Sequence, residues 1–270
     1  MKPEHLSAQI FAKRSCLCVG LDTDLSRIPA HLLQEKDPVF AFNREIIAAT
    51  QEFAVAYKPN LAFYEALGPK GWESLQKTLE LIPEDIMVIA DAKRGDIGNT
   101  SRLYAQAFFE EMKVDAVTVA PYMGQDSVGP FLAFEDKWVF LLALTSNPGA
   151  ADFQYMQEGE EALYQRVLRT AGKWSEDTPG HLGFVVGATR AEAMQEVRAL
   201  APNAWLLVPG VGAQGGDLHS VCQHGRTEEG GLLINSSRGI IYAGNDRNFG
   251  HAAEQAARAL QEQMSPYFVS

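Results

Sequence analysis

Short apolar segments recur along the whole chain, and stretches with helical spacing lie between them. In residues 39–53, for example, apolar side chains fall at positions 39, 42, 46, 47 and 53, which is the spacing of an amphipathic helix. Strand-like segments rich in β-branched residues number eight, at residues 16–21, 54–58, 86–90, 116–120, 139–144, 183–187, 205–208 and 231–235. Further helical segments lie at residues 100–112, 160–171, 190–200 and 251–263. This alternation predicts parallel strands joined by right-handed crossovers.

The number of strand and helix units favours one fold class. Eight units in 270 residues fit a (β/α)8 TIM barrel, whereas a doubly wound open sheet more often has about five or six strands and a glycine-rich first turn. Nothing along the chain resembles a linker or a low-complexity tract, so we expect one domain over residues 1–270. A barrel collects its functional residues at the C-terminal ends of the strands, so the chemistry is expected there.

Composition narrows the possible partners. The formal net charge is −11, which disfavours a nucleic-acid partner bound through a basic surface. Residues 1–7 lack the pattern of a secretory signal, and the longest apolar run, residues 138–144, is too short to span a bilayer. Cys16, Cys18 and Cys222 have no zinc-type spacing, which predicts buried free thiols. We therefore expect a soluble cytoplasmic protein with no membrane partner.

The third strand-like segment runs into the sequence DAKRGDIGNT at residues 91–100. On a strand, Asp91 and Lys93 project from the same face, while Asp96 lies in the following loop or first helical turn. Most charges at this spacing lie at solvated strand ends, which is the alternative interpretation. A buried cluster of carboxylates and an amine could instead hold a charged lysine that delivers a proton, and could destabilise an anion placed against a carboxylate.

Polar residues also follow other predicted strands. Asp22 ends the first strand and Lys58 ends the second, and the period of two places each on the same face as a smaller residue, Cys18 and Ala56 respectively. These faces are expected to line the interior of the barrel, with the charged groups at its mouth. The fifth strand runs into TSNPG at residues 145–149.

The last two strand ends carry the residue types of an anion site. The loop after the seventh strand contains four glycines and a glutamine: Gly210, Gly212, Gln214, Gly215 and Gly216. Arg238 and Gly239 follow the eighth strand. Glycines let backbone N–H groups approach a phosphate, and an arginine can bind two of its oxygens in a fork. The alternative is that these glycines only form tight turns. Part of residues 214–230 could close over a ligand as a lid.

Together these motifs resemble the orotidine 5'-phosphate decarboxylase family, specifically its longer bacterial-type (type 2) subfamily. The motifs that carry the resemblance are DAKRGDIGNT at 91–100, the strand end at Lys58, TSNPGA at 145–150, PGVGAQGG at 209–216 and RGI at 238–240. The D-x-K-x-x-D core alone is shared with related sugar-phosphate enzymes, whereas its combination with the two glycine-bearing loops is specific.

The resemblance implies conversion of orotidine 5'-phosphate (OMP) to UMP and CO2 in pyrimidine biosynthesis, with no cofactor and no metal. Lys58, Asp91, Lys93 and Asp96 would form an array of alternating charges under the pyrimidine, with Lys93 stabilising and protonating the C6 carbanion. Asp96 and Thr100 would reach across from the neighbouring subunit of a homodimer. The substrate-binding residues implied are Asp22, Lys58, Thr100, Ser146, Pro209, Gln214, Arg238 and Gly239. Of these, Asp22 and Lys58 would hold the ribose, Ser146 the pyrimidine edge, and Gln214 with Arg238 the phosphate.

Two other functions stay open from the residues. A Mg²⁺-dependent sugar-phosphate decarboxylase or aldolase of the same barrel group would need a carboxylate near the second strand end. Lys58 stands there, and Glu65 lies seven residues further on. A non-catalytic nucleotide-binding barrel is expected to have lost a member of the charged array, yet all four positions are filled.

Overall fold

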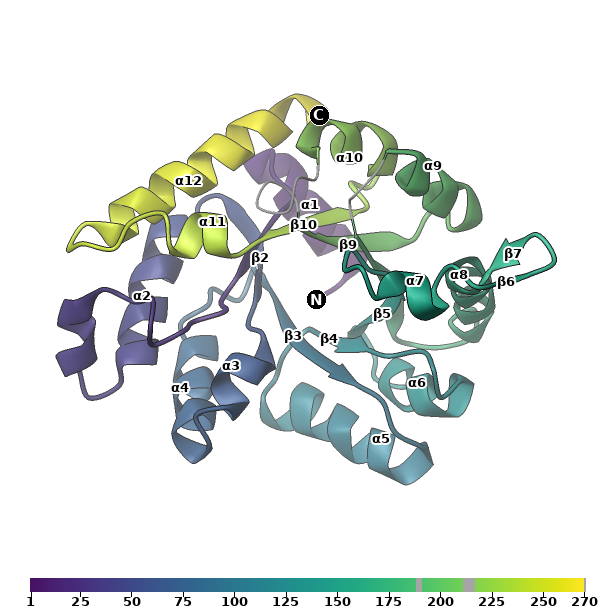
Figure 1. Cartoon of the computed structure of the whole chain (residues 1–270), viewed down its shortest axis with the longest axis horizontal. Coiled ribbons are helices and arrows are strands. Elements are labelled where there is room, and N and C mark those ends of the chain that lie inside the picture. The colour runs from purple at the N-terminus through teal and green to yellow at the C-terminus, as the bar shows by residue number, and fades with distance from the viewer. Residues whose placement is uncertain (188–190, 211–216, 270) are drawn as a thin grey trace.

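The computed structural model describes residues 1–187, 191–210 and 217–269. Eight parallel strands close into a barrel in the order β1, β10, β9, β8, β5, β4, β3, β2 (Figure 1). These strands are β1 (Leu17–Gly20), β2 (Ala54–Lys58), β3 (Met87–Arg94), β4 (Ala116–Val119), β5 (Trp138–Leu144), β8 (His181–Val186), β9 (Trp205–Pro209) and β10 (Leu232–Ser236). The predicted (β/α)8 barrel and its eight strands are confirmed.

Helices surround the barrel and connect its strands (Figure 1). The longer helices are α1 (Pro3–Lys13), α2 (Pro38–Thr50), α4 (Pro69–Leu79), α5 (Gly98–Gln106), α6 (Gln125–Leu132), α8 (Leu163–Trp174), α9 (Ala191–Leu200), α10 (Leu218–Gly225) and α12 (Phe249–Met264). The short ones are η1 (Ala30–Gln34), α3 (Leu61–Glu65), η2 (Ala107–Glu111), α7 (Ala150–Phe153), α11 (Arg238–Ile241) and η3 (Ser265–Tyr267). Helix α2 begins where Pro38 presets the backbone and Asp37 accepts a hydrogen bond from the Phe40 N–H at 3.1 Å.

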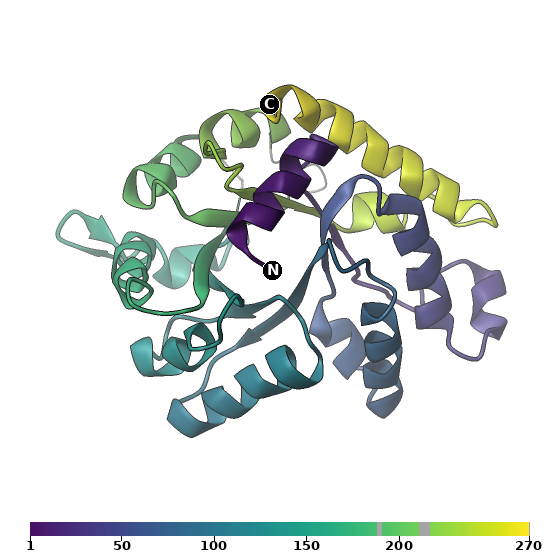
Figure 2. The same ribbon diagram turned by 180° about the vertical axis from the view of Figure 1, so that it is seen from behind.

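Helix α1 crosses the end of the barrel that lies opposite the mouth (Figure 2). Its apolar face buries Leu6 and Ile10 completely. At its C-terminal end, the Lys13 ammonium donates to the carbonyls of Gln51 and Ala54, each at 2.9 Å. This helix therefore closes the base of the barrel, and the strand ends at the opposite face are left for ligands.

Large side chains fill the barrel wall where a glycine makes room for them. Trp138 and Phe140 on β5 are fully buried, and their rings lie 6.0 Å apart. A Cβ atom at Gly183 on the neighbouring strand would lie 2.6 Å from the Phe140 ring. Position 183 therefore excludes any side chain, because the closely packed wall has no room to yield.

The predicted helix over residues 160–171 begins too early. Residues 157–162 instead form a hairpin of β6 (Gln157–Glu158) and β7 (Glu161–Ala162), turned at Gly159 with φ +64°. Arg166 pairs with both hairpin glutamates from the first turn of α8. A left-handed glycine between two glutamates that have cationic partners favours the turn over a continued helix.

The third strand is also longer than predicted, because it continues past Ala90 to Arg94. Its pairing with β4 is interrupted on the way, which determines the geometry of the site described below.

All three cysteines are buried and free, as predicted. Among the helices of the described ranges, none is long and apolar enough to cross a membrane.

Candidate active site at the mouth of the barrel

A wide bulge in β3 forms the floor of the site. Ile89 pairs with Ala116 and Ala90 with Val117, but the next pair along β4 joins Val119 to Arg94. Residues 91–93 of β3 therefore lie opposite the one intervening residue of β4, Thr118. Lys93 has a left-handed backbone, with φ +47°. A non-glycine residue in that region costs free energy and is commonly found where a site requires it. Bulges redirect side chains, and this one brings Asp91 and Lys93 to the mouth.

Asp91 stands between two lysines. The Lys58 ammonium lies 2.8 Å from its Oδ2 atom, and the Lys93 ammonium lies 2.5 Å from its Oδ1 atom. The Lys58 and Asp91 side chains are 6% and 9% exposed, whereas Lys93 is 50% exposed. The inner cation is therefore enclosed, while the outer one is open to a ligand in the mouth.

The electrostatics keep this cluster ionised. Burial raises the pKa of Asp91, but the ammonium groups of Lys58 and Lys93 outweigh burial and hold the pKa of Asp91 well below its usual range. Burial lowers the pKa of Lys58, but Asp91, with Asp22 and Cys18, outweighs it and raises the pKa of Lys58 to about 12. At neutral pH the buried pair is therefore an anion beside a cation.

Asp22 supplies an unused acceptor next to the cluster. Its Oδ1 atom is buried and accepts no hydrogen bond from the described residues, while its main-chain carbonyl accepts one from the Tyr242 hydroxyl at 2.9 Å. A buried carboxylate oxygen without a donor costs about 1–3 kcal/mol or more. Donors on a bound ligand, such as sugar hydroxyls, would remove that cost.

The loop after β5 carries Ser146 against the end of β8. A Cβ atom at Gly187 would lie 2.6 Å from the Ser146 main-chain nitrogen, so the two segments touch there. Gln154 stabilises this loop through two hydrogen bonds to Thr145. Its Oε1 atom accepts one from the Thr145 N–H at 2.7 Å, and its Nε2 atom donates one to the Thr145 hydroxyl at 2.8 Å. The sequence reasoning missed Gln154, which lies in the stretch leading to the hairpin.

The anion site predicted from the last two strand ends is only partly described. Arg238 is the first residue of α11 and exposed, and its side chain makes no hydrogen bond or ion pair with the described residues. Gly239 is exposed beside it, and half-buried Pro209 ends β9. The predicted Gln214, Gly212, Gly215 and Gly216 lie outside the described residues. Arg238 is thus available at the mouth to hold an anion.

Asp96 and Thr100 do not join the cluster within one chain. The Asp96 Oδ1 atom accepts from the Ile97 N–H at 2.7 Å, and Asp96 forms no ion pair with any described residue. Thr100 is exposed on α5. The structure thus brings together Lys58, Asp91 and Lys93, and leaves the fourth member of the predicted array outside.

Thr118 on β4 is a site residue that the sequence reasoning missed. Its hydroxyl donates to Asp91 Oδ1 at 3.0 Å and accepts from the Lys93 N–H at 2.9 Å. The available signal was a single hydroxyl in the apolar segment AVTVA at residues 116–120.

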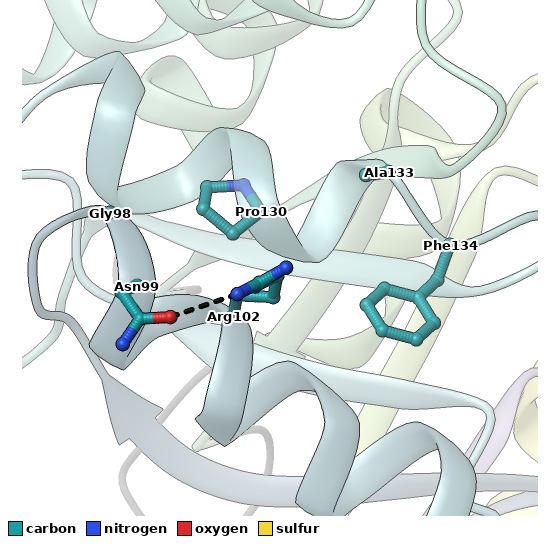
Figure 3. A pocket seen from close by; sticks show the side chains of 6 residues that line it. All are labelled: Gly98, Asn99, Arg102, Pro130, Ala133 and Phe134. Carbon is teal, nitrogen blue, oxygen red and sulfur yellow. Dashed lines mark hydrogen bonds between the residues drawn. The ribbon is translucent and has the colours of Figure 1, made fainter.

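A separate groove of about 600 Å3 lies between α5 and α6 (Figure 3). It is lined by Gly98, Asn99, Arg102, Pro130, Ala133 and Phe134. Arg102 donates to Asn99 Oδ1 at 2.9 Å, so its charge is partly engaged. The groove lies outside the lysine and aspartate cluster but on the same helix as Thr100.

Comparisons with known proteins agree with each other over nearly the whole chain. The model of the orotidine 5'-phosphate decarboxylase / HUMPS family matches residues 15–253. Orotidine 5'-phosphate decarboxylase of Christiangramia forsetii is 56% identical over 98% of both chains, and that of Bacteroides fragilis is 54% identical over 98% of this chain and 97% of the relative.

Solved structures of similar proteins have the same architecture. OMP decarboxylase of Leishmania donovani has a TM-score of 0.81 at 38% identity, covering 97% of this chain and 99% of that one. Orotidine 5'-monophosphate decarboxylase of Plasmodium berghei has a TM-score of 0.84 at 25% identity, covering 98% of each.

Proposed function

The chain belongs to the orotidine 5'-phosphate decarboxylase family, and we propose that it converts OMP to UMP and CO2 without a cofactor. The observation that carries the proposal is the cluster at the mouth, where one carboxylate is held between an enclosed lysine and an open one. We take residues 1–270 as one catalytic domain of pyrimidine biosynthesis, acting in the cytoplasm.

The chemistry follows from where charge appears. When the bond between C6 and the carboxylate carbon breaks, the electron pair stays on C6 and CO2 leaves. The substrate offers no electron sink to C6, so a fixed cation must stabilise the carbanion. Lys93 does this with its exposed ammonium, then transfers a proton to C6 to give UMP. The neutral amine regains its proton from solvent.

Asp91 and Lys58 prepare the site for this step. Asp91 is ionised and faces the departing carboxylate, which it disfavours in the ground state by repulsion. It also holds the Lys93 ammonium at 2.5 Å, so the proton donor is positioned before the substrate arrives. Lys58 remains protonated, and its positive charge keeps Asp91 in the ionised form.

The remaining groups bind the parts of OMP that do not react. The unpaired Asp22 oxygen accepts hydrogen bonds from the ribose hydroxyls, and the Lys58 ammonium donates to them, so the two groups orient the sugar. Arg238 holds the 5'-phosphate, with Gln214 and the backbone N–H of Gly239, while Pro209 lines the site without donating to it. Ser146 holds the pyrimidine edge. Phosphate binding remote from the reacting bond contributes free energy that can assemble the site.

A second copy of the chain completes the charged array. Asp96 is outside the cluster of its own chain, and apolar side chains are exposed on the helix that follows it and on the segment before α6. These are Ile97, Leu103 and Tyr104 near α5, with Tyr122 and Met123 before α6. Exposed apolar side chains beside a catalytic loop suit a subunit interface, and the groove in Figure 3 is lined by other residues of the same helix, α5. In the homodimer, Asp96 and Thr100 reach into the partner's site.

The alternative, a Mg²⁺-dependent enzyme, needs several free carboxylates close together at the mouth, where Asp22 has one unpaired oxygen among the described residues. Both Asp91 oxygens face lysine ammonium groups, and Glu65 is paired with Arg94. These partners favour the decarboxylase over an enzyme that binds Mg²⁺ through the same carboxylates.

The test is turnover of OMP by purified protein in EDTA, followed by loss of substrate absorbance and by chromatographic detection of UMP. Stoichiometric UMP in EDTA supports the proposal. Turnover of phosphorylated keto-sugars only when Mg²⁺ is supplied would assign the chain to the rival reaction. Tight UMP binding without turnover of OMP would make it a non-catalytic nucleotide-binding barrel.

A further inference from the structure

Inside the β3 bulge, Lys93 has an unfavourable left-handed backbone conformation that its neighbours must stabilise. Between Ala90 and Arg94 the regular ladder with β4 is lost. At this point the Lys93 N–H donates to the Thr118 hydroxyl at 2.9 Å, and regular pairing resumes where the Ala120 N–H donates to the Arg94 carbonyl at 2.8 Å. A side chain thus takes the place of a backbone partner inside the bulge.

The same hydroxyl also orients the carboxylate. Thr118 donates its proton to Asp91 Oδ1 at 3.0 Å, the oxygen that also receives the Lys93 ammonium. A hydroxyl has one proton to donate and can accept as well, so both functions of this one are in use. Asp91 is thereby fixed by three donors, from Lys58, Lys93 and Thr118.

The surroundings of Thr118 leave it little freedom. It is 1% exposed, and on its other side it pairs with Phe140 of β5, where the register is regular. β4 therefore keeps regular pairing on the side of β5 and is the strand against which the bulged strand is held.

We propose that Thr118 is a positioning residue, which fixes the Lys93 backbone and the Asp91 carboxylate so that the Lys93 ammonium stands at the reacting carbon. This inference rests on the proposed decarboxylase function. Among the described residues, the Thr118 hydroxyl bonds only to Asp91 and Lys93, and not to Asp22, Lys58 or Arg238, which are proposed to hold the ribose and the phosphate. Its loss should therefore lower kcat and leave ground-state binding nearly unchanged.

The test compares two substitutions at one position. Thr118→Val keeps the branched shape and the strand preference but removes the hydroxyl. Thr118→Ser keeps the hydroxyl and removes only the methyl group. A displacement of about 1 Å at a reacting group can cost roughly 100-fold in rate, so we expect the kcat of Thr118→Val to fall by roughly 10- to 100-fold. Thr118→Ser should stay within about threefold of the wild type, and KM and the affinity for UMP should change by less than about threefold in both variants.

Equal kcat values for the two variants would overturn the proposal, as would a loss in Thr118→Val confined to KM. Should Thr118→Val not fold, as judged by circular dichroism, Thr118→Cys decides instead. A thiol is a weaker hydrogen-bonding group than a hydroxyl, so this variant must be slower than Thr118→Ser. An equal rate refutes the role of the hydroxyl. Absence of turnover in the wild type would instead refute the decarboxylase function itself.

Discussion

Removal of the Lys58 ammonium should destabilise the folded protein at neutral pH. In Lys58→Met, Asp91 loses the cation at 2.8 Å, and the nearby Asp22 carboxylate loses the cation that also faces it. Breaking one partner of a buried ion pair costs about 3–5 kcal/mol because the other charge is left without compensation. Lys93 still pairs with Asp91 but is half exposed, so we expect the lower end, about 3 kcal/mol, or roughly 100-fold in the unfolding equilibrium.

The pH dependence of this deficit has a definite sign. In the wild type the pKa of Asp91 is depressed, so its ion pairs contribute stability above the unfolded pKa, and this contribution is lost as the pH falls through and below that value. In Lys58→Met the pKa of Asp91 must rise, so acid neutralises the uncompensated charge. The difference in stability between the two proteins should therefore be largest near pH 7 and shrink as the pH falls to about 4 and below.

Equilibrium unfolding in urea, followed by circular dichroism at several pH values and one protein concentration, measures this difference. Lys77→Met is the matched control, because Lys77 is 48% exposed and pairs with Asp37 at 2.9 Å on the outer surface. Its effect should be small, since exposed ion pairs contribute little. A deficit for Lys58→Met that is no larger than the control, or that grows toward pH 4, would refute this reasoning.

Three further predictions concern other parts of the molecule. Arg238→Ala should raise KM by roughly 100-fold and also lower kcat, measured by steady-state kinetics, because phosphate binding contributes to assembling the site; a normal KM would contradict the anion role. Arg198 donates to five backbone carbonyls near the base of the barrel. Arg198→Met should therefore lower the free energy of unfolding, measured by urea denaturation, by about 3 kcal/mol, and unchanged stability would refute this structural role. Mixing inactive Asp96→Ala with inactive Lys93→Ala in equal amounts should restore up to roughly a quarter of wild-type activity, because about half of the dimers become hybrids and each hybrid contains one intact site of two. No recovery after subunit exchange would argue against a shared site.

The fold could be predicted because the same pattern of a strand-like segment followed by a helical one repeats along the sequence. Eight strand-like segments, such as residues 54–58, alternate with helical ones, and every repeat independently predicts a parallel strand followed by a helix. The hairpin at residues 157–162 was missed because glutamates followed by apolar residues also fit a helix start. A short hairpin depends on a left-handed glycine and on arginines one turn further along, which a periodicity does not reveal.

The site was predictable only as a set of residue types. Asp91 and Lys93 could be placed on one face by their spacing, but the bulge that brings both to the mouth is a property of register between two strands. Thr118 depends on that register, so its role could not be read from the chain. Asp96 shows the other limit, since its proposed partner lies on a second copy of the chain.

The most direct test of the mechanism is the kcat of Lys93→Ala for OMP beside that of Lys77→Ala. Both lysines are about half exposed and paired with an aspartate, so the control removes a similar charge that does not belong to the cluster at the mouth. If Lys93 stabilises and protonates the carbanion, its loss should lower kcat by at least about 10⁴-fold, while the control keeps wild-type activity. A folded Lys93→Ala variant that retains more than about a tenth of wild-type kcat would contradict the account, because transition-state stabilisation by this ammonium could not then be the source of the rate.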